Sequence, residues 1–528
     1  MKKISTIPFL ELESIPLLIK DFLNAQIPGF EQHIFTPENI EAQFHKKGQS
    51  FSTEKRELLF SVLREQHSLT GLSEKQHANL NDLKQPQTFT VTTGHQLNLF
   101  TGPVFFIYKI LQTIKLAEYL NEKFPERKTV PLFWMATEDH DFEEINHFRT
   151  ENSYYETHAN AGGAVGRIKV SDDRFTADFE NEFRDSVFGT ELVLLIKKAY
   201  AKGNTLSVAT RILVQELFAE YGLLILDGDC AELKAEMKTA FKNELSKQEL
   251  FNESKETVSF LTDKYGKVQV NPREINLFYL SETRDRIEFA HGKYQIVDKD
   301  ISFTEDEILR ELANHPERFS PNALMRPVYQ ETILPNLAYI GGNAEIMYWL
   351  ELRKYFEATN LPFPILIPRN SMLFLTQKIL DNSVKLGLGI PDFFRNFTSV
   401  SKDVLLENNQ ILAELDQAEE TLSTQFANLT SAAEKTDQTF GNLVDAEKTR
   451  QLKSFKRMRK RLLRAEKIKQ NEKLARLEDL FLKVHPGKVW QERAYNFSVF
   501  YSDFGKEWLQ NCFEGLNVQN SELSIFVI

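Results

Sequence analysis

The fold is decided by the stretch TVTTGHQLNLFTGPVFFIYKILQTIKLAEYL, residues 90–120. A β-branched run over residues 88–92 predicts a strand, and Pro103 opens a predicted amphipathic helix over residues 103–123. The loop between them holds two glycines and several polar residues: Thr93, Gly94, His95, Gln96, Asn98, Thr101 and Gly102. Free N–H groups and the positive end of a helix dipole favour an anion there. The unit therefore predicts a nucleotide phosphate site, where His95 supplies a positive charge or a hydrogen bond; the alternative is an ordinary turn.

Further strands follow along the chain. Buried strands are predicted over residues 130–136, 223–227 and 365–367, with helical patterns between them. The alternation of strand, helix and strand is typical of a parallel sheet, whose ligands collect at the carboxyl ends of the strands. The sequence therefore predicts an α/β fold.

A different pattern begins near residue 401. Apolar residues recur at heptad spacing over residues 412–429 and again over residues 455–484, and Asp437 is a predicted N-cap between the two runs. The charges of residues 403–436 are mostly acidic, whereas residues 448–476 are strongly basic. Opposite charges favour antiparallel pairing of the two arms, so we predict a long helical hairpin that forms a homodimer.

We divide the chain into predicted segments as follows. Residues 1–87 form an N-terminal helical lead-in packed on the core, 88–150 the first part of the core, 151–203 a first insertion, 204–230 core, 231–320 a second insertion of mixed helices and short strands, 321–400 core, 401–485 the hairpin, and 486–528 a return to the core.

The composition limits the function classes. The chain has 528 residues and a formal net charge of -11, which argues against nucleic-acid binding; the basic residues 448–476 have a simpler partner in the acidic arm. Only two cysteines occur, Cys230 and Cys512, so we expect neither a disulfide framework nor a cysteine zinc site, and the reducing cytoplasm is the expected compartment. We expect no signal peptide and no membrane span, because no apolar run is long enough.

The second candidate site is TEDHDFEEINH, residues 137–147, directly after a predicted buried strand. Its acids and histidines are Glu138, Asp139, His140, Asp141, Glu143, Glu144 and His147. Such a cluster is costly unless an ammonium or a metal ion balances it, and a carboxylate there could act as a general base. The alternative is a helix start, where the dipole alone favours acids.

Two more motifs follow. YIGGNAE, residues 339–345, holds Gly341 and Gly342, which let the backbone approach a flat ligand, and the alternative is a turn that needs positive φ. PRNS, residues 368–371, follows a predicted strand and offers Arg369 to a phosphate; an ordinary surface arginine is the alternative.

The chain resembles the bacillithiol biosynthesis cysteine-adding enzymes, the BshC family, over nearly its whole length. The resemblance rests on TGHQLNLFTGPVFFIYKI, FWMATEDHDFEEINH, RPVYQETILPNLAYIGGNAEIMYWLEL, PRNS and the basic LLRAEKIK helix. It implies a Rossmann-like core with two connecting insertions and a coiled-coil domain used for dimerisation. It also implies a ligase that joins the carboxyl of L-cysteine to the amine of glucosaminyl malate. The family's similarity to cysteinyl-tRNA synthetases suggests ATP as cosubstrate.

The resemblance assigns expected roles to single residues. The loop 93–96 takes the place of the synthetases' HIGH signature, and residues 341–345 take that of their Gly-Gly substrate loop. The expected catalytic residues are His95, Asp139, His140 and Asp141. The expected nucleotide-binding residues are Thr93, Gly94, Gln96, Asn98, Gly341, Gly342, Arg369 and Ser371. The expected substrate-binding residues are Glu138, Glu144, Asn343 and Glu345. No metal ligand is expected. Because the chain has no KMSK-like sequence, a non-catalytic nucleotide-binding dimeric scaffold is the alternative function.

Overall fold

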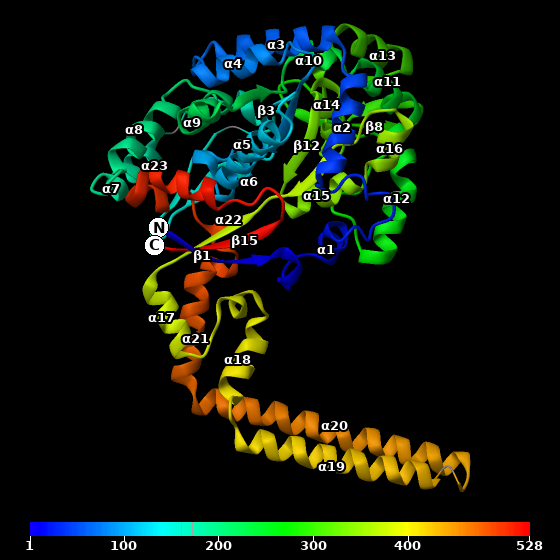
Figure 1. Cartoon of the computed structure of the whole chain (residues 1–528). Helices are drawn as coiled ribbons and strands as arrows, with labels where there is room; N and C mark the ends of the chain where they lie inside the picture. Colours follow the sequence, from blue (N-terminus) through cyan, green and yellow to red (C-terminus); the bar gives the residue numbers. More distant parts are fainter. Residues whose placement is uncertain (160, 172, 434) are drawn as a thin grey trace. The chain divides into compact units, whose positions relative to one another are not determined.

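A parallel sheet forms the centre of the computed structural model (Figure 1). Its strands, in their order across the sheet, are β13 (Ile365–Pro368), β12 (Asn336–Gly341), β2 (Thr88–His95), β3 (Lys128–Met135) and β6 (Leu224–Asp227). All neighbouring pairs in this sheet are parallel. The structure describes residues 1–159, 161–171, 173–433 and 435–528. The prediction of an α/β fold with a parallel sheet is confirmed.

The order of the strands reverses at β2. From β2 the chain adds β3 and then β6 on one side, and later adds β12 and then β13 on the other. This is the doubly wound order of Rossmann-like proteins, which bind ligands in the crevice outside the carboxyl ends of the strands where the order reverses. The ends of β2 and β12 are therefore where a ligand site is expected.

Strand β2 is longer than the sequence predicts. Thr93, Gly94 and His95 continue the pairing with β3, opposite Phe133, Trp134 and Met135. These residues belong to the sheet and not to a loop, because β3 runs beside them to its end. The helix that follows, α5 (Phe105–Lys123), begins two residues after Pro103, and strand β12 is not predicted at all.

Helices cover the parallel sheet with apolar side chains. Ile40 and Phe44 of α2 (Pro37–Ser50) and Leu116 and Leu120 of α5 pack in one cluster with buried residues of β2, β12 and β13. Residues 106–114 of α5 are all buried, so only the second half of this helix, with Leu116, Ala117 and Leu120 buried, has the one-sided apolar pattern that is predicted. The sheet is thus fixed by residues that the sequence pattern identifies.

Smaller sheets lie beside the parallel one. An antiparallel sheet has the order β10 (Ser302–Phe303), β9 (Lys293–Ile296), β8 (Arg284–Ala290), β7 (Leu277–Leu280) and β11 (Phe319–Pro321). A further sheet has the order β1 (Lys2–Pro8), β15 (Glu522–Val527) and β14 (Ser371–Leu375), and β4 (His147–Arg149) pairs with β5 (Tyr154–Glu156). The short strands expected within residues 231–320 are confirmed.

The other helices of this part of the chain are α1 (Leu17–Leu23), α3 (Thr53–His67), α4 (Glu74–Asp82), α6 (Phe142–Ile145), α7 (Arg174–Phe183), α8 (Gly189–Ala199), α9 (Leu206–Phe218), α10 (Ala231–Ala235), α11 (Lys238–Lys247), α12 (Glu249–Tyr265), α13 (Glu305–Asn314), α14 (Met325–Ile333), α15 (Asn343–Leu350), α16 (Arg353–Ala358), α22 (Gln491–Ala494) and α23 (Ser498–Gly515). In the part of the chain that the structure describes, no helix has the length and apolar character needed to cross a membrane.

The N-terminal segment contains a strand that the sequence analysis misses. Residues 1–87 hold α1 to α4, as expected, but also β1, which pairs antiparallel with β15 at the other end of the chain. Among the residues of β1 only Ile7 is buried, so the strand has no alternating apolar pattern. Its partner, more than five hundred residues away, cannot be predicted from local sequence.

The described chain divides into two units. Unit 1 comprises Met1–Glu11, Ile15–Phe374 and Gln491–Val527; unit 2 comprises Leu12–Ser14, Leu375–Trp490 and Ile528. The two long segments of unit 1 meet side by side, because the Phe374 N–H donates to Gln491 Oε1 (2.9 Å) and Gln491 Nε2 donates to the Phe374 carbonyl (2.9 Å). Unit 2 is thus an insertion into unit 1.

Unit 2 is helical. Its helices are α17 (Gln377–Lys385), α18 (Phe397–Leu406), α19 (Gln410–Ala433), α20 (Gln438–Lys469) and α21 (Asn471–Val484). Asp437 caps α20 by accepting hydrogen bonds from the N–H groups of Thr439 and Phe440, as predicted. Opposite charges join α19 and α20: the Arg459 guanidinium lies 2.6 Å from Asp416 Oδ1 and also pairs with Glu419. The predicted helical hairpin is confirmed.

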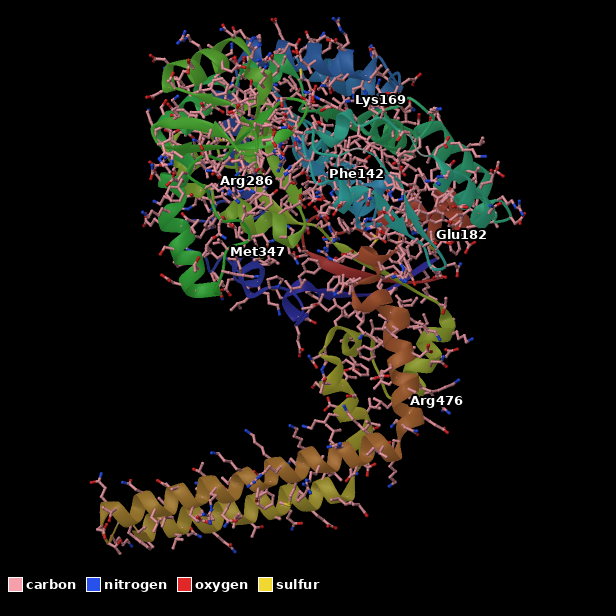
Figure 2. The ribbon with its side chains drawn as sticks, turned by 180° about the vertical axis from the view of Figure 1, so that it is seen from behind. Phe142, Lys169, Glu182, Arg286, Met347 and Arg476 are labelled. Atoms are coloured by element: carbon pink, nitrogen blue, oxygen red, sulfur yellow. The ribbon has the colours of Figure 1, made fainter. Side chains whose placement is uncertain are left out.

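Many basic side chains of unit 2 project into solvent. Arg476 of α21 is 74% exposed, and Figure 2 shows its side chain extending away from the helix. Part of the predicted heptad seam is also exposed, because Leu429 is 46% and Met458 is 41% accessible. Another seam residue, Phe455, is buried. Half-buried seam residues are Leu412, Leu415, Leu422, Phe426 and Leu462. The hairpin therefore has an apolar contact of its own and leaves further apolar side chains uncovered.

A buried ion pair ties the N-terminal helices to the core of unit 1 and gives a stability prediction. Lys47 Nζ of α2 lies 2.6 Å from Glu331 Oε2 of α14, and both side chains are almost fully buried. Replacing Lys47 with Met leaves the buried Glu331 carboxylate without a cation. We expect the free energy of unfolding to fall by about 3–5 kcal/mol. Urea denaturation at pH 7 measures this change.

The exposed neighbour on the same helix provides the control. Lys46→Met should change the free energy of unfolding by no more than about 0.5 kcal/mol, because Lys46 contacts only the exposed Gln32. Adding Glu331→Gln to Lys47→Met removes the unpaired charge and should recover part of the loss. A double variant that is as unstable as Lys47→Met alone contradicts this explanation.

Candidate active site

A cavity of about 580 Å³ lies in unit 1 at the carboxyl ends of β2, β3 and β12, where the strand order reverses. Its wall also includes residues of α14, α15 and the antiparallel sheet. The predicted site residues that line it are Gly94, His95, Gln96, Glu138, Asp139, His140, Glu144, Gly342, Glu345 and Arg369. The structure thus brings residues of all four predicted motifs to one cavity.

His95 lies at the end of β2 with its ring packed against aromatic side chains. The ring centroid lies 5.3 Å from that of Phe105 and 5.2 Å from that of Phe106, and Nε2 has no hydrogen-bond partner among the described residues. Burial, together with the Lys109 ammonium, lowers the pKa of His95 to about 3. The low pKa disfavours the expected positive charge on His95 at neutral pH, whereas the alternative role, a hydrogen bond from the neutral ring, stays a prediction.

A buried lysine that the sequence analysis misses joins strand β2 to helix α15. Lys109 Nζ of α5 donates to the Gly94 carbonyl (2.6 Å) and to Glu345 Oε1 and Oε2 (2.9 and 2.7 Å). Glu345 also accepts hydrogen bonds from Tyr339 Oη and the Gly342 N–H, both at 2.7 Å. The sequence does contain a sign of Lys109, because it is a charged residue within an otherwise mostly apolar stretch, residues 106–114, all of which are buried in α5.

Glu345 has a structural role in this network. Burial acts to raise the pKa of Glu345, but the Lys109 ammonium and the hydrogen bonds from Gly342 and Tyr339 hold it at about 2. Its oxygens are already paired within the protein, so the geometry does not support the expected role in substrate binding. Neither Gly341 nor Gly342 has positive φ. A Cβ on Gly341 would lie 2.9 Å from the Tyr339 ring, so close packing explains this glycine.

An acidic side of the cavity forms around Gln96. Its Nε2 donates to Asp139 Oδ2 (2.8 Å) and to Glu144 Oε2 (2.9 Å), and thereby holds two carboxylates together. Like charges repel, so this side favours a ligand ammonium and disfavours a phosphate. The expected role of Gln96 in nucleotide binding does not fit its position beside these acids.

His140 and Asp141 are each held by a protein partner. Arg284 Nη1 of β8 lies 2.8 Å from His140 Nδ1, and burial together with Arg284 lowers the pKa of His140. The neutral ring can therefore accept this hydrogen bond. Asp141 caps α6 by accepting from the Glu144 N–H (3.3 Å), and it does not line the cavity. The alternative of a helix start thus explains Asp141, and we leave it out of the site.

A basic side of the cavity is formed by arginines from distant segments. Arg369 is paired with Glu492, with its Nη2 2.7 Å from Oε1 and its Nη1 3.0 Å from Oε2, and it lies over the Phe105 ring. Arg493 lies over the same ring, at 5.4 Å from its centroid. These arginines form a cationic surface next to His95.

Arg326 of α14 has an open donor. Its guanidinium lies 5.9 Å from the Trp134 ring centroid and 5.4 Å from that of Tyr339, and Nη1 donates to Gln330 Oε1 (2.9 Å). Its Nη2 is buried and has no hydrogen-bond partner within 3.5 Å among the described residues, and the Tyr348 hydroxyl lies close to the guanidinium. Sequence reasoning misses Arg326, Arg284 and Arg493. Arg326 begins the quoted RPVYQETILPNLAYIGGNAEIMYWLEL motif but is not singled out there, and no motif marks Arg284 or Arg493. The open donor makes Arg326 suited to hold a carboxylate or phosphate.

Other predicted residues lie outside the cavity. Thr93 Oγ1 donates to the Ile340 carbonyl (2.8 Å), Ser371 Oγ donates to Glu492 Oε1 (3.1 Å), and Asn98 precedes the turn at residues 99–101. The predicted residues that do not line it are Thr93, Asn98, Asp141, Gly341, Asn343 and Ser371. Within the described residues, no group of three or more His, Cys, Asp and Glu side chains could hold a metal ion.

The reversed strand order, and the acidic and basic sides of the cavity at that point, define a Rossmann-like α/β protein with a site for a small polar ligand. Comparison with known proteins narrows this class. Residues 7–370 match the family model described as "Bacillithiol biosynthesis BshC, N-terminal Rossmann-like domain". Residues 372–528 match the model described as "Bacillithiol biosynthesis BshC, C-terminal coiled-coil domain". The chain therefore belongs to the BshC family.

Similar proteins cover nearly the whole chain. A protein of Flavobacterium johnsoniae is 40% identical over 515 residues, which span 97% of this chain and 97% of that protein. Proteins of Christiangramia forsetii (40% over 523 residues) and Flavobacterium psychrophilum (39% over 513 residues) each span 96% of both chains. All three are named "Putative cysteine ligase BshC". The resemblance predicted from the sequence motifs is confirmed.

The low pKa of His95 gives a prediction for stability at acid pH. A histidine whose folded pKa is lowered stabilises the fold fully above its unfolded pKa, near 6.5, and this stability is lost as pH falls towards about 3. Between pH 7 and pH 5 we expect the wild type to lose about 2 kcal/mol more than His95→Gln, whose amide does not titrate. Urea denaturation at both pH values measures the difference, and equal losses in the two proteins contradict the prediction.

Proposed function

We propose that this protein is a carbon–nitrogen bond-forming ligase that joins the carboxyl of L-cysteine to the amine of glucosaminyl malate, with ATP as cosubstrate. The observation that supports this most is the polarity of the cavity. Its acidic side, with Gln96, Asp139 and Glu144, suits an ammonium, and its basic side, with Arg326 and Arg493, suits a carboxylate or phosphate. A volume of about 580 Å³ is within the usual range for small-molecule sites.

The reaction requires activation of a carboxylate. An oxygen of the cysteine carboxylate attacks a phosphorus atom of ATP and displaces either pyrophosphate or ADP. The amine nitrogen then attacks the activated carbonyl carbon, AMP or phosphate leaves, and the amine gives up a proton. Neutral His95 can donate or accept a hydrogen bond here without a net charge, and the backbone at Gly94 and Gly342 allows a ligand to approach closely.

The alternative function is a non-catalytic nucleotide-binding dimeric scaffold. Incubating the purified protein with cysteine, glucosaminyl malate and ATP distinguishes the two. We expect the amide product by mass spectrometry, and the identity of the released nucleotide shows whether AMP or ADP forms. Nucleotide binding without any product would support the scaffold. A reducing compartment such as the cytoplasm suits a thiol substrate and the free Cys230 and Cys512 of the protein.

Arg326 supplies the first variant for this assay. We expect Arg326→Gln to raise the KM for glucosaminyl malate about 10- to 100-fold, because a charged hydrogen bond to a substrate carboxylate is worth about 1.5–3 kcal/mol. Arg286→Gln is the matched control, since Arg286 of β8 is 45% exposed, pairs with Glu288, and does not line the cavity. If the KM for ATP rises and the KM for glucosaminyl malate does not, Arg326 binds a phosphate of ATP.

We also propose a homodimer formed through α19 and α20. Leu443 and Ile468 of α20 are 62% and 72% exposed, an arrangement that a second copy would cover. Replacing both with Asp should convert the dimer to a monomer by light scattering, because charges at an apolar contact are costly to bury. Leu194→Asp is the control, since Leu194 of α8 is 64% exposed in unit 1. A variant that remains dimeric refutes this contact.

A further inference from the structure

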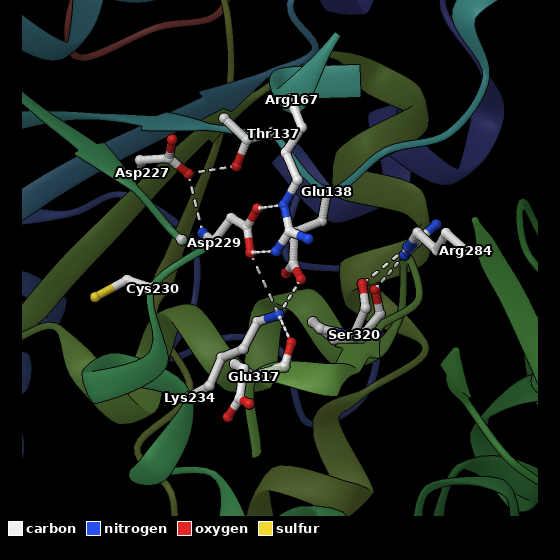
Figure 3. A network of polar contacts seen from close by, with 12 residues as sticks. Thr137, Glu138, Arg167, Asp227, Asp229, Cys230, Lys234, Arg284, Glu317 and Ser320 are labelled. Atoms are coloured by element: carbon white, nitrogen blue, oxygen red, sulfur yellow. Dashed lines mark hydrogen bonds and ion pairs between the residues drawn. The ribbon is translucent and has the colours of Figure 1, made fainter. Parts of the chain in front are cut away.

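A network of polar contacts surrounds Glu138, a residue that lines the cavity (Figure 3). Lys234 of α10 has no exposed side-chain surface and forms ion pairs with Glu138 and, at 3.7 Å, with Asp229 Oδ1. Its Nζ also donates to the Glu317 carbonyl (2.9 Å). The Glu138 side chain is 12% exposed and lines the cavity. Lys234 therefore holds Glu138 from the side opposite to a ligand.

The same network is closed by an arginine from the first insertion. Arg167 Nε and Nη2 donate to Asp229 Oδ2 and Oδ1, both at 2.7 Å. The Asp229 N–H in turn donates to Asp227 Oδ1 (2.9 Å), at the end of β6. Asp229 thus has a cation of its own in Arg167, and it shares Lys234 with Glu138. Any change in one of these groups alters the charge balance at Glu138.

The charged and titratable groups that face Glu138 come from several elements. Lys234, Asp229, Arg284, Arg167 and Tyr329 all interact electrostatically with it. Burial raises the pKa of Glu138 above its usual range, Asp229 adds to this effect, and Lys234 and Arg284 act against it. A carboxylate with a raised pKa is a better proton acceptor, and Lys234 limits how far the rise goes.

We propose that Glu138 accepts the proton that the attacking amine loses, and that Lys234 is the positioning residue that holds Glu138 ionised and in place. This inference rests on the proposed function. The substrate enters as an ammonium and one N–H proton passes to a Glu138 oxygen. The freed nitrogen lone pair forms the bond to the activated carbonyl carbon, whose bond to the phosphate leaving group breaks, and the departing phosphate takes the second N–H proton. Release of the proton to solvent restores the carboxylate.

The position of Glu138 favours it over the neighbouring acids. Asp139 and Glu144 are bridged by Gln96, which occupies one oxygen of each and suits them to hold an ammonium. Glu138 receives no such amide, and its partner is a lysine on the far side. A base must be unprotonated to act, so the rate is expected to rise with pH through the pKa of Glu138.

The experiment is the pH dependence of kcat and kcat/KM for the full-length protein. Glu138→Gln should lower kcat by about 10²-fold or more. Lys234→Met should move the acidic limb of the pH profile up by about 1 to 3 pH units, because an opposite charge near the carboxylate is lost. In the Glu138→Gln background, Lys234→Met should not move the limb. The proposal is overturned if the acidic limb of Lys234→Met coincides with that of the wild type. It is also overturned if the limb is lost in Asp139→Asn but kept in Glu138→Gln.

Two further variants separate this role from a loss of folding. Arg167 is 53% exposed, so Arg167→Gln should fold normally, yet it leaves Asp229 less neutralised and should move the limb in the same upward direction. Lys47→Met removes a lysine that, like Lys234, is buried in an ion pair with a glutamate but lies outside the cavity. The acidic limb of this variant's pH profile should coincide with that of the wild type. A limb that moves equally in Lys47→Met, or not at all in Arg167→Gln, counts against Lys234 as a positioning residue.

A measurement of folding stability, which needs no catalytic turnover, distinguishes failure of this inference from failure of the proposed function. Glu138 has a raised folded pKa, so the wild type should lose stability relative to Glu138→Gln as pH rises from the unfolded pKa, near 4.3, through the folded pKa. In the Lys234→Met background this loss should extend to higher pH. If no amide forms but this shift is observed, the proposed function fails and the coupling of Lys234 to Glu138 holds. If the amide forms and neither the limb nor the stability shifts, the inference fails alone.

Discussion

The site depends on the ammonium of Lys109. It is buried within the apolar helix α5, where a charge without a partner would be very costly, and it is neutralised by Glu345 and the Gly94 carbonyl. Gly94 belongs to β2, and Glu345 belongs to α15, the helix that directly follows β12. Lys109 therefore links the end of β2 to the start of α15 at the cavity, beside the neighbouring strands where the order of the sheet reverses.

The arginines at the cavity differ in how they are paired. Arg369 is bound by the buried Glu492 and Arg284 by His140, Ser320 and the Pro321 carbonyl, so both are held in place by the protein. Arg326 Nη2 is buried and has no hydrogen bond within 3.5 Å to any described residue. Arg369 and Arg284 are thus held in the wall by protein partners, whereas Arg326 has a donor that a ligand can use. The acidic side has a similar division, since Lys234 holds Glu138 from behind whereas Gln96 bridges Asp139 and Glu144.

Sequence reasoning succeeds where a local pattern specifies the structure. The helix α5, the β-branched run of β2 and the Asp437 cap all have causes within a few residues, and each is present, although β2 extends to His95 and α5 begins at Phe105. It fails where a residue is defined by a distant partner. Strand β1 pairs with the last strand of the chain, and the donor of Arg326 matters only because β3 and β12 place aromatic rings against it. The motifs predict which segments meet, but they do not show that Glu345 and Arg369 are already paired, or that Asp141 is a cap.

The contact between Phe374 and Gln491 has a consequence for how the chain is made. Because these two residues are hydrogen-bonded neighbours, everything between them leaves and re-enters unit 1 at nearly one point. Glu492, which holds Arg369, and Arg493, which lines the cavity, both emerge from the ribosome after that excursion. A nascent chain released before residue 491 would have the whole parallel sheet but an incomplete basic side. Synthesis of the hairpin thus delays completion of the cavity until the last few dozen residues are added.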